Sequence, residues 1–181
     1  MSVAQLAPRK GFHVLIEACH YLTQQDVPFR CYIFGEGTER SRLESLIKEY
    51  NLGDRILMPG RIHQAELRQF LNRADVFVLP CVRDNDGDQD GIPVVLMEAM
   101  AMELPVISTS LSGIPELISH ERNGLLVPPS DAVALADALQ RLKNNRAMRK
   151  QLGKLGRETV IGDFNIHRSA ERMAALLEEA A

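Results

Sequence analysis

Two carboxylates flank a segment with the features of a helix start that binds an anion. Asp90 and Glu98 are separated by seven residues, and Pro93 between them is typical of the first turn of a helix. The N–H groups of Val94 and Val95 would then lie at the helix N-terminus, where they lack intrahelical acceptors and attract phosphate. We therefore expect a diphosphate here, with the two carboxylates accepting hydrogen bonds from the hydroxyl groups of a sugar and a ribose on either side.

A cation for the same diphosphate is available in the first loop of the chain. Lys10 lies in the run Ala7-Pro8-Arg9-Lys10-Gly11, directly before an expected helix. A lysine in that position can bind phosphate, and it can equally be a solvated side chain near a turn. The residues of this loop alone leave both interpretations open.

Several other kinds of chemistry are excluded because their motifs are missing. The Gly35-Glu36-Gly37 turn begins like the dinucleotide fingerprint G-x-G-x-x-G, but Arg40 occupies its sixth position. The sequence contains neither the P-loop motif nor the G-x-S-x-G nucleophile elbow. Nucleotide binding of those two kinds and serine hydrolase chemistry are therefore not expected.

A metal site is not expected either. The 5 histidines fall on different expected elements without ligand spacing. The acidic loop fits the calcium-binding form D-x-D-x-D-G from Asp86 to Gly91, but its twelfth position, which must supply a bidentate glutamate, is Met97. These observations favour a solvated acidic loop over a calcium site.

Length and composition indicate a globular, cytoplasmic domain. The 181 residues suffice for one domain with a sizeable core, and 45% of them are hydrophobic. A net charge of -3 does not supply the positive field that nucleic acids require, so no nucleic-acid partner is expected. The 3 cysteines form no C-x-x-C pair, which indicates reduced thiols, and neither a membrane span nor a secretion signal is expected. Because the chain starts within an expected strand, we interpret it as a fragment of a longer protein.

Short apolar runs alternate with segments of helical periodicity along the whole chain. Short strands separated by longer helices predict crossover connections, and hence an α/β fold with a Rossmann-like, doubly wound parallel sheet. Ligands of such sheets bind at the carboxyl ends of the strands, where the loops described above lie. The expected strands are 2–6, 28–34, 55–58, 75–79, 105–108 and 125–127, and the expected helices are 11–25, 38–50, 64–74, 93–102, 114–119, 131–144, 146–159 and 165–181.

One long segment resembles a known family. The segment from Asp90 to Ile118, DGIPVVLMEAMAMELPVISTSLSGIPELI, is similar to the donor-binding segment of group 1 (family 4) retaining glycosyltransferases, which has two glutamates seven residues apart followed by an AMA-x-G-x-PV run. The context Gly-Asp-x-Asp-Gly-Ile-Pro most resembles the branch that builds exopolysaccharides, including colanic acid. Further matches in family order are Leu6–Gly11, Ile33–Gly37, Met58–Arg61, Ala74–Pro80 and Asn123–Val127.

The resemblance implies an enzyme of the GT-B fold, which consists of two Rossmann-like domains. This chain would hold the C-terminal, nucleotide-sugar-binding domain as residues 1–164, with 165–181 as the C-terminal helix of the same domain and the N-terminal acceptor domain absent. The donor would be a nucleotide diphosphate sugar of the UDP or GDP type, bound without a metal or other cofactor. A glycan or lipid-linked acceptor would bind through the other domain, and peripheral membrane association would concern only the complete enzyme.

The same resemblance implies roles for individual residues. Lys10 would hold the donor diphosphate, Asp90 the transferred sugar and Glu98 the ribose, and these three are the candidate catalytic residues. Phosphate would be bound by N–H groups at the start of the following helix, and the nucleobase by backbone groups after the third strand. The implied substrate-binding residues are Gln5, Gly35, Gly60, Arg61, Ile62, Gly91, Ile92, Pro93, Val94 and Val95.

Three departures from the family pattern keep alternatives open. Gln5 stands where the family usually has arginine, Asp90 replaces the first glutamate, and Glu103-Leu104 replaces a small glycine. A non-catalytic nucleotide-sugar-binding or regulatory module of the GT-B type, or another GT-B reaction such as phosphorolysis or epimerisation, therefore remains an alternative. For Glu98 alone, the alternative is that it is an ordinary exposed helix residue.

Overall fold

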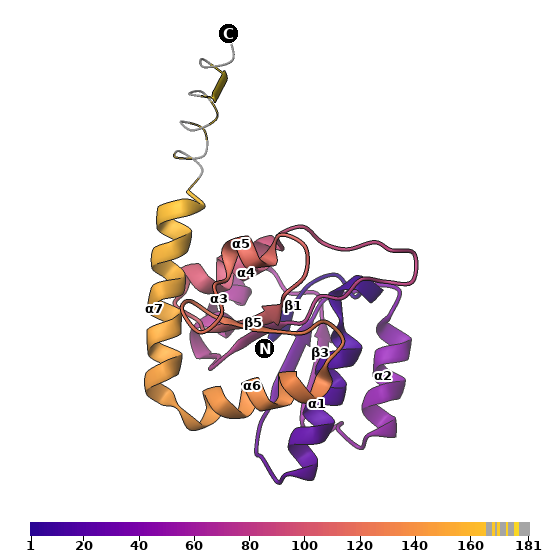
Figure 1. Cartoon of the computed structure of the whole chain (residues 1–181). Coiled ribbons are helices and arrows are strands. Elements are labelled where there is room, and N and C mark those ends of the chain that lie inside the picture. The colour runs from indigo at the N-terminus through magenta and orange to yellow at the C-terminus, as the bar shows by residue number, and fades with distance from the viewer. Residues whose placement is uncertain (166–167, 169, 171–172, 174–175, 178–181) are drawn as a thin grey trace.

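The computed structural model describes residues 1–165, 168, 170, 173, 176 and 177, and it confirms the predicted parallel α/β architecture (Figure 1). Every pairing between its strands is parallel. The strands of the described part are β1 (Ser2–Val3), β2 (Cys31–Phe34), β3 (Ile56–Gly60), β4 (Phe77–Leu79), β5 (Val106–Thr109) and β6 (Leu125–Val127).

Two three-stranded sheets, ordered β1-β2-β3 and β4-β5-β6, meet at β1 and β4. Val78 donates its N–H to the carbonyl oxygen of Met1 at 2.9 Å, and the amino group of Met1 donates to the carbonyl oxygen of Val76 at 2.8 Å. The strands therefore follow one another in space as β3-β2-β1-β4-β5-β6, the order of the doubly wound dinucleotide-binding fold. In this order the chain switches sides of the sheet between β1 and β4, so the carboxyl ends of these two strands form the topological switch point.

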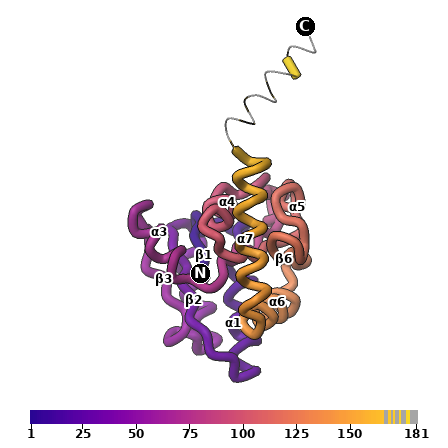
Figure 2. Tube along the Cα trace, turned by 90° about the vertical axis from the view of Figure 1, so that its left-hand side faces the viewer, coloured from indigo at the N-terminus to yellow at the C-terminus, as the bar shows by residue number. Residues whose placement is uncertain are grey.

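Helices cover both faces of the joined sheet (Figures 1 and 2). Helix α1 packs against α6, and α4 packs against α7. These layers shield the central strands, and β4 is accordingly wholly apolar and buried over Phe77–Leu79. The helices within residues 1–165 are the short 3-10 helix η1 (Pro8–Lys10), α1 (Phe12–Gln24), α2 (Arg40–Glu49), α3 (Gln64–Arg73), α4 (Val94–Ala101), α5 (Ile114–Leu117), α6 (Ala132–Asn144) and α7 (Arg146–Asp163).

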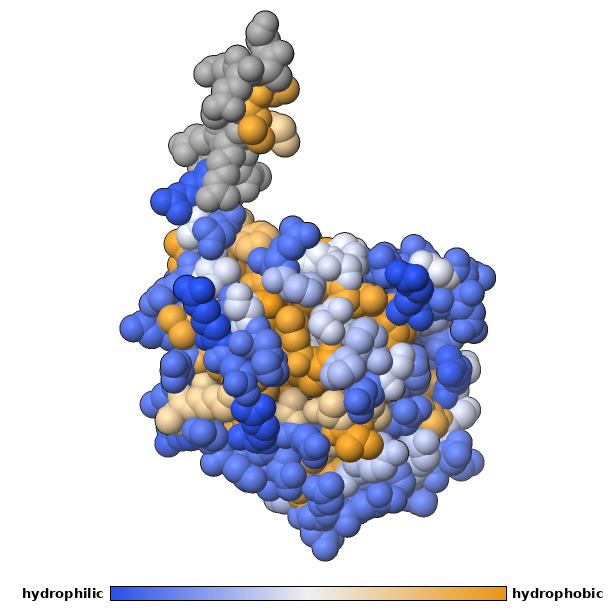
Figure 3. All heavy atoms as spheres, in the orientation of Figure 1, coloured by the Kyte–Doolittle hydropathy of each residue, from blue (hydrophilic) through white to orange (hydrophobic). Residues whose placement is uncertain are grey.

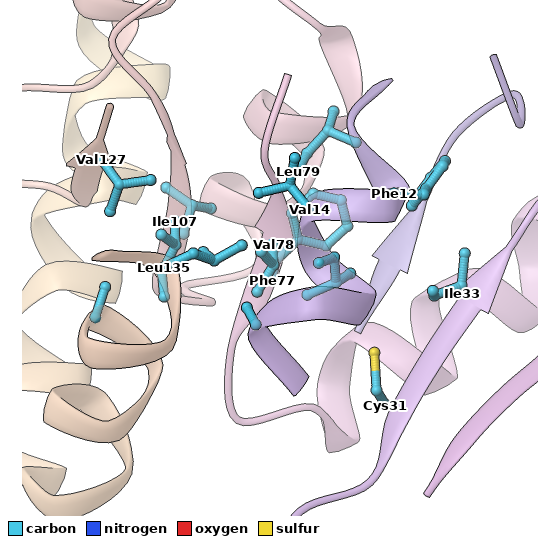
Figure 4. Close-up of a cluster of buried hydrophobic side chains, with 14 of the residues drawn as sticks. Phe12, Val14, Cys31, Ile33, Phe77, Val78, Leu79, Ile107, Val127 and Leu135 are labelled. Atoms are coloured by element: carbon cyan, nitrogen blue, oxygen red, sulfur yellow. The ribbon is translucent and has the colours of Figure 1, made fainter. Parts of the chain in front are cut away.

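The centre of the core is strand β4, in which Phe77 and Leu79 are fully buried. Figure 4 shows the β4 side chains between Ile107 and Leu135 on one side and Ile33 on the other. Such close packing gives the strand ends little freedom. The loops that leave β1 and β4 therefore start from fixed points.

Some element boundaries differ from the prediction. The strand expected from residue 28 begins at Cys31, whose N–H donates to the carbonyl oxygen of Arg55 directly before β3. The strand expected over 2–6 ends at Val3, since Leu6 donates its N–H to Glu36 in the loop after β2. Helix α7 continues past the predicted end at residue 159 to Asp163. The predicted helix 165–181 lies largely outside the described residues.

Candidate functional site

The loop after β1 is held against the loop after β4 by backbone contacts. Gly11 has a φ of +67°, and a Cβ atom at this position would lie 1.9 Å from the carbonyl oxygen of Pro80. Only glycine allows this approach. Val82 donates its N–H to the carbonyl oxygen of Arg9 at 2.9 Å. The residues of η1 are thereby fixed at the switch point of the sheet, beside the segment that leads into α4.

Two cations of η1 converge there on one carboxylate, and we call this cluster of Arg9, Lys10 and Asp90 the charged corner. Lys10 Nζ lies 2.8 Å from Asp90 Oδ2, and Arg9 Nε lies 3.4 Å from Asp90 Oδ1. The Lys10 and Asp90 side chains are only 13% and 16% exposed, so solvent screens this pair less than a surface ion pair. Arg9 also reaches Asp88, at 3.5 Å, in the acidic loop.

A buried thiol completes the surroundings of Asp90. Cys81 Sγ lies 3.7 Å from Asp90 Oδ2 and donates a weak hydrogen bond to it. Burial, and after it the negative charge of Asp90, raises the pKa of Cys81 to about 12. The thiol therefore stays protonated near neutral pH and serves as a donor to the carboxylate rather than as a nucleophile.

The start of α4 presents free amides next to the charged corner. Pro93 precedes the first helical residue, and no side chain caps this helix. The N–H groups of Val94 and Val95 thus belong to the first turn, which has no intrahelical acceptors. The Val94 side chain is 66% exposed, so the helix N-terminus is not covered by the core. Ile92 fixes the approach to the helix by packing against Gly113, whose Cβ would lie 2.9 Å from Ile92 Cγ1.

Glu98 lies one turn into α4, four residues after Val94 and hence on the same side of the helix. Its side chain is half-buried, while Leu96, Ala99 and Met100 form the fully buried side of α4. Among the described residues no hydrogen bond or ion pair occupies the Glu98 carboxylate. Both oxygens are therefore available to hydroxyl groups of a ligand.

A recess lies at the carboxyl ends of β1, β2 and β3. We call it the loop pocket; its volume is about 440 Å³. Gly35 makes it possible, since its φ is +144° and a Cβ would lie 1.9 Å from the carbonyl oxygen of Ala4. The Gly35 N–H also donates to Gly60 at 2.9 Å, which joins the loops after β2 and β3. The residues that line the loop pocket are Val3, Ala4, Gln5, Gly35, Glu36, Gly37, Arg61 and Ile62.

A larger cavity, of about 610 Å³, lies at the opposite edge of the sheet. Its lining includes Met1, Cys31 and Val76, which lie at the amino ends of β1, β2 and β4. Figure 3 shows apolar side chains gathered in the centre of the face where Figure 1 marks the N-terminus. The smaller recess is the candidate site, because parallel sheets bind ligands at the carboxyl ends of their strands, beside the switch point.

The structure divides the residues predicted for the site into two neighbouring groups. Lys10 and Asp90 contact each other, and the segment Gly91–Val95 leads from them into α4. Gln5, Gly35, Arg61 and Ile62 line the loop pocket, while Gly60 supports it through its carbonyl oxygen. Sequence reasoning did not single out Arg9, Glu36 or Cys81. The position of Arg9 directly before Lys10 was the available signal.

The described residues show two further properties. They contain no cluster of three or more His, Cys, Asp or Glu side chains that could hold a metal ion. Among their helices, none combines the length and the apolar character needed to cross a bilayer.

The strand order defines a Rossmann-like domain, and the charged corner and the N-terminus of α4 form the candidate site at its switch point. Comparison with known families is more specific. Residues 1–159 match the family described as glycosyl transferases group 1, and the chain belongs to that family.

Comparisons with individual proteins agree. WcaL of Escherichia coli strain K12, named for glycosyl transfer in colanic acid biosynthesis, is 46% identical over 179 residues, which are 98% of this chain and 44% of WcaL. The C-terminal domain of the group 1 glycosyl transferase LpcC from Francisella tularensis has a TM-score of 0.78 and 25% identity, covering 91% of this chain and 85% of that one. HepE of Anabaena, solved with UDP, shares the fold with a TM-score of 0.85 at 21% identity, over 98% of this chain and 48% of HepE. The chain thus spans less than half of WcaL and HepE, but most of the LpcC domain.

Proposed function

We propose that this chain is the donor-binding, C-terminal half of a retaining glycosyltransferase. The complete enzyme transfers a sugar from a nucleoside diphosphate sugar to a glycan or lipid-linked acceptor in exopolysaccharide synthesis. One observation carries the proposal: Lys10 and Asp90 meet at 2.8 Å beside the free N-terminus of α4. The family match, the similarity to WcaL and the UDP complex of HepE support the same class of donor.

The proposed chemistry is mainly electrostatic. Negative charge grows on the diphosphate as its bond to the sugar breaks, and the Lys10 ammonium and the amides of Val94 and Val95 stabilise that charge. Because these groups are already in place, little reorganisation is needed during the reaction. Binding of the donor exchanges the Asp90 partner of Lys10 for phosphate. Asp90 then becomes available to the hydroxyl groups of the sugar.

The nucleoside part of the donor continues from the diphosphate through the ribose to the base. The Glu98 carboxylate, which has no partner in the described part of the chain, accepts hydrogen bonds from the ribose hydroxyls. The nucleobase occupies the loop pocket, where Arg61 and Ile62 contact it. Backbone groups of the turn Gly35-Glu36-Gly37 supply the remaining contacts. The base is therefore held by the shape of the pocket more than by charge.

Further parts of the proposal concern the complete enzyme. The other half supplies the acceptor site, and only the complete enzyme associates with the membrane periphery. The reaction occurs in the cytoplasm, which is consistent with three free cysteines in the described residues. The Lys10 ammonium and the helix N-terminus meet the diphosphate without a metal ion.

Calorimetric titration of the chain with UDP, GDP and ADP tests the donor class. We expect at least one of these nucleotides to bind, with an affinity that excess EDTA does not change. The absence of binding by all three would overturn the proposal, and loss of binding in EDTA would overturn its metal-free form.

A non-catalytic module of the same fold is the second candidate, favoured by Gln5 and Asp90, which depart from the arginine and the glutamate of the family pattern. An assay of the complete parent enzyme separates the two functions. Transfer of sugar to a glycan or lipid acceptor supports the enzyme. Donor binding without any transfer supports the non-catalytic module.

A further inference from the structure

The charged corner contains a cation that the proposed mechanism has not used. Arg9 Nε lies 3.4 Å from Asp90 Oδ1, while Lys10 Nζ lies 2.8 Å from the other oxygen of the same carboxylate. The two cations thus face one anion from adjacent positions of η1. Any anion that replaces Asp90 at Lys10 comes within reach of the Arg9 guanidinium as well.

The charge balance at this point requires Arg9. Lys10 and Asp90 form a pair of zero net charge, and a neutral pair does not attract a diphosphate that carries two or more negative charges. Arg9 makes these three side chains net positive, and its further partner Asp88 is 65% exposed, so solvent screens that carboxylate more than Asp90. The planar guanidinium of Arg9 can also donate two parallel hydrogen bonds to phosphate oxygens, which the single ammonium of Lys10 cannot do.

The Arg9 side chain can turn to a ligand at little cost. Its second partner, Asp88, is 65% exposed, and ion pairs with such exposed partners contribute little to stability. The backbone of Arg9 is fixed by the hydrogen bond from Val82, so only the side chain has to move. The side chain itself is 30% exposed, which leaves it accessible to a ligand at the charged corner.

We propose that Arg9 is a second diphosphate-binding residue of this chain and that it exchanges Asp88 and Asp90 for the phosphate oxygens of the donor. This inference rests on the proposed function, since it assigns a further residue to the same donor site. It places Arg9 on the terminal phosphate, together with Lys10. The positive charge of the site then comes from two adjacent residues of η1.

The test compares a nucleoside diphosphate with its monophosphate in calorimetric titrations, using UDP and UMP or GDP and GMP, whichever base the unchanged chain binds more tightly. We expect Arg9→Gln to weaken diphosphate binding roughly tenfold, as for the loss of a charge-assisted hydrogen bond, and to change monophosphate binding much less. Arg83→Gln is the matched control. Arg83 is an exposed cation of the adjacent loop that bonds to Gln89, so its loss should leave both affinities unchanged.

The outcomes are distinct. Equal losses for diphosphate and monophosphate would assign Arg9 a structural role, and unchanged binding of both would remove it from the site; either result overturns the inference. If the unchanged chain binds none of the nucleotides, the proposed function fails and this inference fails with it. Should Arg9→Gln not fold, Arg9→Lys keeps the charge without the planar fork, and the ratio of diphosphate to monophosphate affinity should still fall severalfold.

Discussion

The two parts of the candidate site at the carboxyl edge of the sheet are built in different ways. The loop pocket is shaped by backbone, with Gly35 in contact with the backbone of Ala4 and bonded to Gly60. The charged corner is shaped by side-chain charges, with Arg9 and Lys10 gathered around Asp90. The loop pocket should therefore be sensitive to volume and insensitive to salt. The charged corner should be sensitive to salt and insensitive to volume.

The largest effect is expected when volume is added to the loop pocket. Gly35→Ala places a Cβ 1.9 Å from the carbonyl oxygen of Ala4, at a φ of +144° that alanine rarely adopts. We expect the free energy of unfolding to fall by about 3 kcal/mol, measured by urea denaturation. Gly53→Ala is the control, since no atom lies within 4 Å of a Cβ at Gly53. If the two variants are equally stable, the backbone account of the loop pocket is wrong.

Removal of the cation from the charged corner should affect binding more than folding. Lys10→Ala is expected to weaken the binding of a nucleoside diphosphate by roughly 10- to 100-fold, because one charge-assisted interaction is lost next to the remaining Asp90 carboxylate. Titration calorimetry measures the change. Lys154→Ala removes a 73% exposed lysine of α7 and should leave the affinity unchanged. An equal affinity of the Lys10 variant and the unchanged chain would separate Lys10 from the diphosphate.

Glu98 tests the side of the site at which the described residues offer no partner to its carboxylate. Glu98→Gln should weaken UDP or GDP binding about tenfold, because a neutral amide is a poorer acceptor for two ribose hydroxyls than a carboxylate. The loss should be much smaller with 2′-deoxynucleoside diphosphates. Glu158→Gln, at an exposed position of α7, is the matched control. The same loss with ribose and deoxyribose ligands would contradict the assigned contact.

The smallest effect is expected from Asp90, and it has the opposite sign. Asp90→Asn removes the anion that competes with phosphate for Lys10 and Arg9, so free UDP or GDP should bind about threefold more tightly at low salt. The gain should decrease as the ionic strength rises. The nucleotide sugar should gain less than the free nucleotide, because it loses the Asp90 contact. A weaker affinity for free nucleotide at low salt would show that Asp90 supports phosphate binding rather than competing with it.

The fold could be predicted from the sequence because short apolar strands alternate with amphipathic helices along the chain. Buried strands such as Phe77–Leu79 are short and wholly apolar, and helices such as Ala132–Asn144 show regular spacing. Helix ends were less predictable. The end of α7, for example, lies four residues beyond the predicted one, and nothing in the local sequence marks the difference.

The residues of the candidate site could be predicted from the sequence, but their arrangement in space could not. Lys10 and Asp90 are 80 positions apart, and their ion pair depends on how Gly11 packs against Pro80. Such a long-range contact is set by tertiary structure, which local sequence does not encode. Arg9 was missed for the same reason, since its proximity to Asp90 exists only after the loops after β1 and β4 meet.

A crystal structure of the chain with the nucleoside diphosphate that it binds most tightly tests the central claim most directly. The terminal phosphate is expected within about 3 Å of Lys10 Nζ and of the amide nitrogen of Val94 or Val95, with the base in the loop pocket. A nucleotide bound instead in the cavity at the amino ends of β1, β2 and β4, with Lys10 still paired to Asp90, would contradict the account.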